Sequence, residues 1–290
     1  MIRNKGHSMR TETKHLLMVV TLLVFSGCDA GEMAPAPVEQ PAATDAPKTE
    51  KEIRAVIEEM GGSFSPDNKG LALKSLPITN EDLKHLQGLT DLQFLDLHET
   101  PITDEGLVHL EGLANLRDLY LNDTAITDAG LEHLKGLTSL RTLRLFGTQV
   151  NGAGLEHLER LTDLNAINLN GLPLSDAELE HLKGLSKLST LYISGDQVTD
   201  VGMAHLKGLP RLSMLILTGT QIGDAGLEQL KGFPSLQFLF IDDTSITDDG
   251  LQHLKAMPDL KRLTLDNTQI TDGGLAELKA EMPAYAKGKR

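Results

Sequence analysis

Apolar residues recur along this chain with a period of 24 residues from Leu92 onward. Each copy follows the pattern LxxLxLxxTxITDxGLxHLxGLxx, which is clear in LRDLYLNDTAITDAGLEHLKGLTS, residues 116–139. A degenerate copy precedes the regular ones and keeps their register. A repeat of this length is typical of a solenoid, in which each copy packs against its neighbours. The eight regular copies begin at Leu92, Leu116, Leu140, Leu164, Leu188, Leu212, Leu236 and Leu260. The degenerate copy has its apolar residues at Leu71, Leu73, Ile78, Leu83 and Leu86.

Two kinds of spacing alternate within each copy. The LxxLxL segment has a period of two, which predicts a short strand. The next segment changes to helical spacing, since Leu107, Leu110 and Leu113 are three residues apart and share one face of a helix. The Thr-Asp pair before it offers a side-chain oxygen and a negative charge to the start of that helix, and Gly112 or its equivalent ends it. We therefore predict an α/β fold with a parallel sheet of at least eight strands on a concave face and short α-helices on the convex one.

The LxxLxL core with its trailing I…GLxxLxxL resembles the leucine-rich repeat over roughly residues 68–280. Among bacterial leucine-rich repeat proteins it is most similar to those with helix-containing, GALA-like or cysteine-containing-like repeats, with Thr where others carry Asn or Cys. The resemblance implies a right-handed horseshoe with a non-enzymatic binding function, but a fold alone does not name a ligand. The fourth copy departs from the pattern at Leu172, Pro173 and Glu178, and the fifth at Gly195-Asp196. These departures predict a local change in curvature.

The ends of the repeat array need covers. Residues 51–62, KEIRAVIEEMGG, form an amphipathic segment that predicts a helix ended by its two glycines. The turn sequence SPDNKG, residues 65–70, predicts a hairpin. We therefore assign residues 50–91 to an N-terminal cap with the degenerate copy, residues 92–280 to the eight regular copies, and residues 281–290 to a C-terminal tail.

The first 28 residues have the layout of a signal peptide, because basic residues precede the apolar run LLMVVTLLVFSG, residues 16–27. That run is too short to cross a bilayer core of about 30 Å. The stretch from Phe25 to Cys28, FSGC, resembles a bacterial lipobox, which implies a lipid on Cys28 and a membrane-anchored protein of the cell envelope, periplasmic or at the surface. An ordinary secretory signal with an incidental cysteine is the alternative, and either Met1 or Met9 is the start. Residues 29–49 are rich in Ala and Pro and predict a disordered tether.

Composition narrows the class of function. The net charge of -14 and the absence of a basic stripe argue against nucleic acid as a partner. The one cysteine lies in the leader, and no catalytic serine motif or phosphate loop is present, so we expect a non-enzymatic monomer without a cofactor. Histidine occupies one repeat position at His85, His109, His133, His157, His181, His205 and His253. Because packed helix axes are about 8–10 Å apart, we expect these side chains to hydrogen-bond between copies rather than share a metal.

The third, fifth and seventh positions of each copy should face outward from the sheet, since they alternate with the core leucines. Six of the ten aromatic residues of the chain fall in this set. Adjacent strands are about 4.8 Å apart, so aromatic and aliphatic residues on three successive copies should form one exposed surface. The candidate ligand-binding residues are Tyr192, Met214, Ile216, Phe238, Phe240, Phe94, Tyr120, Arg144 and Phe146.

An exposed apolar surface of this kind is typical of a binding site for a protein or peptide. Acidic side chains are expected on both sides of it, which favours a partner with an apolar centre and basic edges. The acids are Asp96, Glu99, Asp118 and Asp123 on the early copies and Asp242, Asp243 and Asp266 on the late ones. Two alternatives stay open: a glycan-binding module that uses the aromatic rings as stacking platforms, and a passive structural spacer of the envelope.

Overall fold

A computed structural model describes residues 49–257 and 259–281, all within the compact unit Pro47–Arg290. The predicted signal peptide, Cys28, nearly all of the tether and the tail from residue 282 lie outside the described residues. Among the helices of the described ranges, none is long and apolar enough to cross a membrane.

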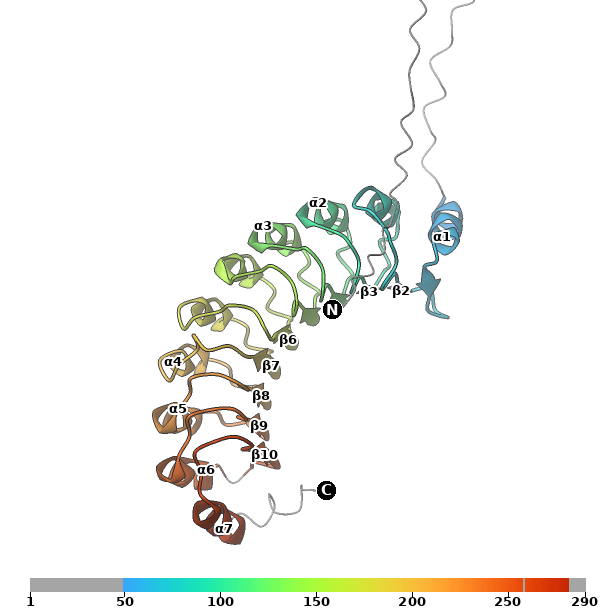
Figure 1. The fold of residues 1–290 in the computed structure, drawn as a ribbon. Helices are drawn as coiled ribbons and strands as arrows, with labels where there is room; N and C mark the ends of the chain where they lie inside the picture. The colour runs from blue at the N-terminus through green and yellow to red at the C-terminus, as the bar shows by residue number, and fades with distance from the viewer. Residues whose placement is uncertain (1–48, 258, 282–290) are drawn as a thin grey trace, which may run out of the picture. The chain divides into compact units, whose positions relative to one another are not determined.

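The strands form one sheet in chain order, on the inner side of the stacked repeats (Figure 1). The first two, β1 and β2, pair antiparallel as the predicted hairpin, and every later neighbour pair is parallel. Paired residues in the parallel part are one repeat apart, such as Leu95 with Leu119, so equivalent positions of successive copies form straight rows. The strands are β1 Ser63–Phe64, β2 Gly70–Ala72, β3 Phe94–Asp96, β4 Asp118–Tyr120, β5 Thr142–Arg144, β6 Ala166–Leu169, β7 Thr190–Ile193, β8 Met214–Ile216, β9 Phe238–Phe240 and β10 Arg262–Thr264.

The convex elements are only partly the predicted α-helices, because many of their turns are 3₁₀ (η). In a 3₁₀ turn, residues three apart lie one above the other, which suits leucines spaced by three. The elements are α1 Glu50–Glu59, η1 Glu81–Gly88, α2 Asp104–Leu107, η2 Val108–Leu110, α3 Asp128–Leu131, η3 Glu132–Leu134, η4 Ala153–Leu158, η5 Glu178–Leu182, α4 Met203–Leu206, α5 Asp224–Leu230, η6 Asp248–Gly250, α6 Leu251–Lys255 and α7 Asp272–Glu281.

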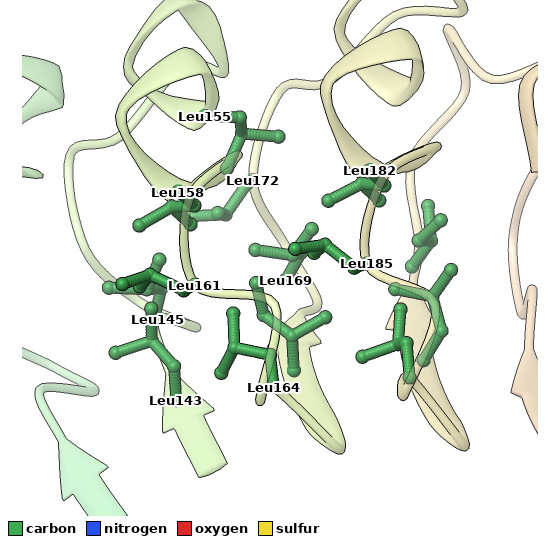
Figure 2. Packing of buried hydrophobic residues seen from close by; sticks show 14 of the residues in the cluster. Leu143, Leu145, Leu155, Leu158, Leu161, Leu164, Leu169, Leu172, Leu182 and Leu185 are labelled. Atoms are coloured by element: carbon green, nitrogen blue, oxygen red, sulfur yellow. The ribbon is translucent and has the colours of Figure 1, made fainter. Parts of the chain in front are cut away.

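The core is a continuous stack of leucines between the sheet and the convex turns (Figure 2). Leu143 on β5, Leu145 directly after this strand, and the turn residues Leu155 and Leu158 all belong to this core and are fully buried. Neither element could bury its apolar side alone, so each repeat depends on its neighbours for stability. At the N-terminal end, α1 supplies Ile53 and Ile57 to this core as the predicted cap.

A carboxylate ladder ties successive copies together. The side chain of Asp104 accepts hydrogen bonds from the N–H of Thr127 at 2.8 Å and from its hydroxyl, one copy later. Asp176, Asp224 and Asp248 make the same pair of bonds to Thr199, Thr247 and Thr271. The Asp lies in the first turn of its own helix, as predicted, but its side chain accepts hydrogen bonds from the start of the next copy. The Thr does act locally, since Thr127 accepts from the N–H of Ala129.

The ladder explains the glycine two residues after the Asp. A Cβ on Gly130 would lie 2.3 Å from Oδ1 of Asp104, and one on Gly250 would lie 2.2 Å from Oδ1 of Asp224. Glycine at this position therefore leaves the space that the carboxylate of the preceding copy occupies.

The fourth copy uses a different carboxylate. The third copy has Gly152 where the ladder Asp should be, and 26 residues later Glu178 replaces the ladder glycine. Glu178 accepts from the N–H of Ser175 at 2.8 Å and from its hydroxyl at 2.6 Å. It therefore provides, from within the fourth copy, the carboxylate acceptor that the third copy lacks. Asp82 does the same for Thr79 in the degenerate copy, at 2.7 and 2.8 Å. The departure at Glu178 is thus a paired exchange with Gly152, and the expected change in local curvature stays a prediction.

Candidate functional site on the concave face

The outward-facing side chains of β7, β8 and β9 meet as one surface. Alternation holds in β9, where Leu239 is fully buried and Phe238 and Phe240 on either side are half-buried. Strand register places Met214 beside Phe238 and Ile216 between Tyr192 and Phe240. We call the set Tyr192, Met214, Ile216, Phe238 and Phe240 the apolar patch. Its side chains partly cover one another, so the patch is less exposed than the sequence predicts.

A second group of candidate residues lies on β3, β4 and β5. The rings of Phe94 and Tyr120 pack edge to face, with centroids 5.2 Å apart at an interplanar angle of 84°. The guanidinium carbon of Arg144 lies 3.9 Å from the centroid of the Tyr120 ring, a distance typical of a cation–π contact. Phe146 follows this strand and is half-buried. The structure therefore separates the candidate residues into two groups, one at each side of β6.

Between the two groups the concave face is hollowed, because β6 contributes small side chains. Ala166 forms part of the floor, Arg144 and Tyr192 stand on opposite walls, and the depression has a volume of about 290 Å³. Arg144, Asn168 and Tyr192 are register partners on β5, β6 and β7, so they form one straight row across the sheet. We call these three residues the donor row.

Asn168 is not among the candidate ligand-binding residues predicted from the sequence. Its signal was nonetheless available, since it occupies the fifth position of its copy, between the copies that carry Arg144 and Tyr192 at the same position. The side chain has a defined orientation, because its Oδ1 accepts the backbone N–H of Asn170 at 3.0 Å. The Nδ2 group is therefore left as the available donor.

The acidic rim differs from the prediction. The prediction that Asp96 is exposed is wrong, since this residue is only 7% exposed and its Oδ1 lies 2.6 Å from Nδ1 of His98. The neighbouring register partners Ala72 and Tyr120 flank it and shield it from solvent. Asp242 accepts from the hydroxyl of Thr264 at 2.6 Å. The Asp242 carboxylate thus links two neighbouring copies, whereas Asp96 contacts a side chain of its own copy.

The histidine row makes contacts between copies. Nδ1 of His133 lies 2.7 Å from Oε1 of Glu111, and Nδ1 of His181 lies 2.8 Å from Oε1 of Glu159, each one copy earlier. Across residues 49–257 and 259–281, no group of three or more His, Cys, Asp or Glu side chains could hold a metal ion.

Comparison with known proteins identifies the architecture. The family model described as Leucine Rich repeat matches residues 112–135. The structure is similar to that of internalin C2 from Listeria monocytogenes, with a TM-score of 0.57 and 23% identity over 77% of this chain and 84% of that one. It is also similar to a Listeria monocytogenes internalin, inlF, with a TM-score of 0.52 and 20% identity over 81% of this chain and 86% of that one. The comparison with curated proteins returns no match. The chain therefore has the leucine-rich repeat fold, as predicted.

Proposed function

We propose that this chain is a non-enzymatic recognition module of a bacterial cell envelope, which binds a protein or peptide on its concave face. The apolar patch is the observation that carries the proposal. It gathers two phenylalanines, a tyrosine, a methionine and an isoleucine on three adjacent strands, and such residues anchor protein interfaces. The leucine-rich repeat fold supports protein binding in general.

The concave face is less suited to glycan stacking, which needs an uncovered aromatic ring face. Arg144 lies over the ring of Tyr120, and the guanidinium carbon of Arg262 lies 5.4 Å from the ring centroid of Phe240. A passive spacer has no need for half-exposed aromatic residues on adjacent strands. Protein or peptide binding is therefore the function that these contacts favour.

The test replaces the centre of the apolar patch. The double variant Phe238→Asp and Phe240→Asp should keep the circular dichroism spectrum of the wild-type chain and lose capture of its partner from an envelope extract. The matched control is Val108→Asp with Val201→Asp, because these convex residues are 41% and 65% exposed. Capture that survives the concave substitutions, or that is lost equally in the control, would refute the proposal. Crosslinking from position 240 in intact cells would then identify the partner.

The envelope location is a separate part of the proposal and rests on the lipobox-like stretch that ends at Cys28. A lipid on Cys28 followed by the Ala- and Pro-rich tether would hold the repeats away from a membrane. Cells fed a labelled fatty acid should incorporate the label into the wild-type chain but not into Cys28→Ser. Equal labelling of the two, or a wild-type chain released in soluble form, would refute the anchor without affecting the concave-face proposal.

A further inference from the structure

We infer that the donor row binds a carboxylate, so that the preferred partner presents an acidic side chain next to the residues that fill the apolar patch. This inference rests on the proposed function and adds the chemistry of the ligand to it. Arg144 is the principal group, with Asn168 and Tyr192 beside it in register.

Charge complementarity is the first argument. The outward positions of the four copies that begin at Leu140, Leu164, Leu188 and Leu212 carry a single charged residue, which is Arg144. The chain as a whole has a net charge of -14, so a lone cation at the centre of its concave face is not explained by overall composition. At the central face, an anionic group would find no carboxylate at these positions to repel it.

The hydrogen-bonding state of the row is the second argument. In the part of the chain that the structure describes, the exposed Arg144 side chain forms no ion pair and no hydrogen bond, and its recorded contact is with the Tyr120 ring. Nδ2 of Asn168 likewise has no acceptor there, while the Tyr192 hydroxyl makes only a long contact of 4.0 Å to Sδ of Met214. Three donors therefore lie in one row across the depression. A carboxylate is the acceptor that a planar guanidinium binds through two parallel hydrogen bonds.

The size of the depression is the third argument. Its volume of about 290 Å³ and its floor at Ala166 leave room for a side chain to reach the row. Tyr120 holds the guanidinium from one face, which reduces the entropy that Arg144 loses when a ligand binds.

The geometry also predicts the spacing within the ligand. Arg144 is on β5 and Ile216 is on β8, three strands away, which is about 14 Å at about 4.8 Å per strand. An extended peptide covers this distance in roughly four residues at about 3.3 Å each. The partner segment should therefore carry an acidic residue and, roughly four positions away, a large apolar residue.

The experiment selects ligands from a random library, so it does not require the natural partner. A phage library of random linear nonapeptides is selected on the full-length chain, and the most enriched peptide is synthesised and its Kd measured. We expect an Asp or Glu in the enriched peptides at the stated spacing from an apolar residue. Arg144→Ala should weaken binding at least 10-fold, which corresponds to about 1.4 kcal/mol. The Kd of Arg144→Lys should lie between the Kd of wild type and that of Arg144→Ala, since lysine keeps the charge but loses the paired hydrogen bonds.

Two controls make the result specific. Arg160→Ala removes an exposed arginine from the convex side of the same copy and should leave Kd unchanged. Peptides in which the acid is replaced by its amide should bind wild type as weakly as the parent peptide binds Arg144→Ala. A peptide with an amidated C-terminus distinguishes a side-chain carboxylate from the terminal one. Loss of binding on amidation would mean that the donor row binds the C-terminal carboxylate of the peptide.

The outcomes separate this inference from the proposed function. Peptides that need Phe238 and Phe240 but lack an acid and ignore Arg144→Ala would refute the donor row while leaving concave-face recognition in place. Binding that ignores both sets of substitutions would refute the proposed function itself. Binding of acidic glycans in place of any peptide, tested on an array and sensitive to Arg144→Ala, would overturn the assignment to a peptide carboxylate.

Discussion

At the scale of single residues, a glycine in this repeat has a role that depends on what the preceding copy places against it. Gly130 faces the Asp104 carboxylate, where a Cβ would lie 2.3 Å from Oδ1, whereas Gly136 has no atom within 4 Å of its Cβ position. These two glycines lie in the same copy, six positions apart. They allow the packing role of glycine to be separated from its effect on the unfolded chain.

The substitution Gly130→Ala should lower the free energy of unfolding by about 1–2 kcal/mol, because overpacking costs about 1–3 kcal/mol and the better helix propensity of Ala offsets part of it. Gly136→Ala should be neutral or stabilising by up to about 1 kcal/mol. Urea titration followed by circular dichroism measures both. Equal shifts for the two variants would show that the Asp104 contact does not set the identity of residue 130.

At the scale of elements, the paired exchange at Gly152 and Glu178 predicts strong coupling between two substitutions. Gly152→Asp alone should destabilise the chain, because the residue has a φ of 107° and its Cβ would lie 2.6 Å from Cγ of Glu178. Glu178→Gly alone should cost about 1–3 kcal/mol, because the N–H and hydroxyl of Ser175 lose their acceptor.

The double variant recreates the arrangement of the other copies, so its loss should be smaller than the sum of the single losses by at least about 1 kcal/mol. A double-mutant cycle from urea titrations measures this coupling. Pairing Gly152→Asp with the remote Gly136→Ala is the control and should be additive. Additivity in the Gly152 and Glu178 pair as well would show that Glu178 does not replace the missing Asp.

Much of this element structure could be predicted from the sequence, because local periodicity determines it. Leu239 and Phe240 were assigned to opposite faces from alternation alone, and the structure places them there. Contacts between copies were harder, since they depend on positions 23–26 residues apart. The exchange at Gly152 and Glu178 could have been recognised in the sequence, because these two residues are 26 positions apart. The burial of Asp96 could not have been recognised in this way, because it depends on the packing of Ala72 and Tyr120 on the neighbouring strands.

At the scale of the described repeats, two regular arms meet in a less regular centre. In the outer copies, a backbone N–H after the strand donates to a backbone carbonyl of the next copy. The N–H of Asp123 donates to the carbonyl of Phe146, and the N–H of Gly219 donates to the carbonyl of Asp242. In the centre, Gly171 donates to the hydroxyl of Ser194 instead. The central strands β6 and β7 are each one residue longer than β5, so the sheet gains pairing where the loop contacts change. The donor row crosses these same strands, which places the inferred ligand site over the most divergent copies.

Carboxylates that accept hydrogen bonds from the Thr or Ser before the convex turns make the stability of the array dependent on pH. Hydrogen bonds from the Ser175 hydroxyl and N–H lower the pKa of Glu178. Bonds from Thr79 lower the pKa of Asp82, and those from Thr271 lower the pKa of Asp248. A carboxyl group whose pKa is lower in the folded state binds protons first in the unfolded chain, so its contribution is present above the ordinary carboxyl pKa of about 4 and is lost as the pH falls through the lower folded value.

We therefore expect the free energy of unfolding to fall as the pH is lowered from 6 to 3, and Glu178→Gln to reduce that change. The variant should be less stable than wild type at pH 6, because the neutral amide is a weaker acceptor for Ser175, and should approach wild type at pH 3. The control Glu58→Gln removes a carboxylate with no side-chain hydrogen bond among the described residues and should run parallel to wild type. Urea titrations at each pH measure the difference. Because each copy contacts only its neighbours, a Glu178→Gln curve parallel to wild type would mean that the hydrogen bonds from Ser175 to Glu178 at the start of the fourth copy do not limit the stability of the array.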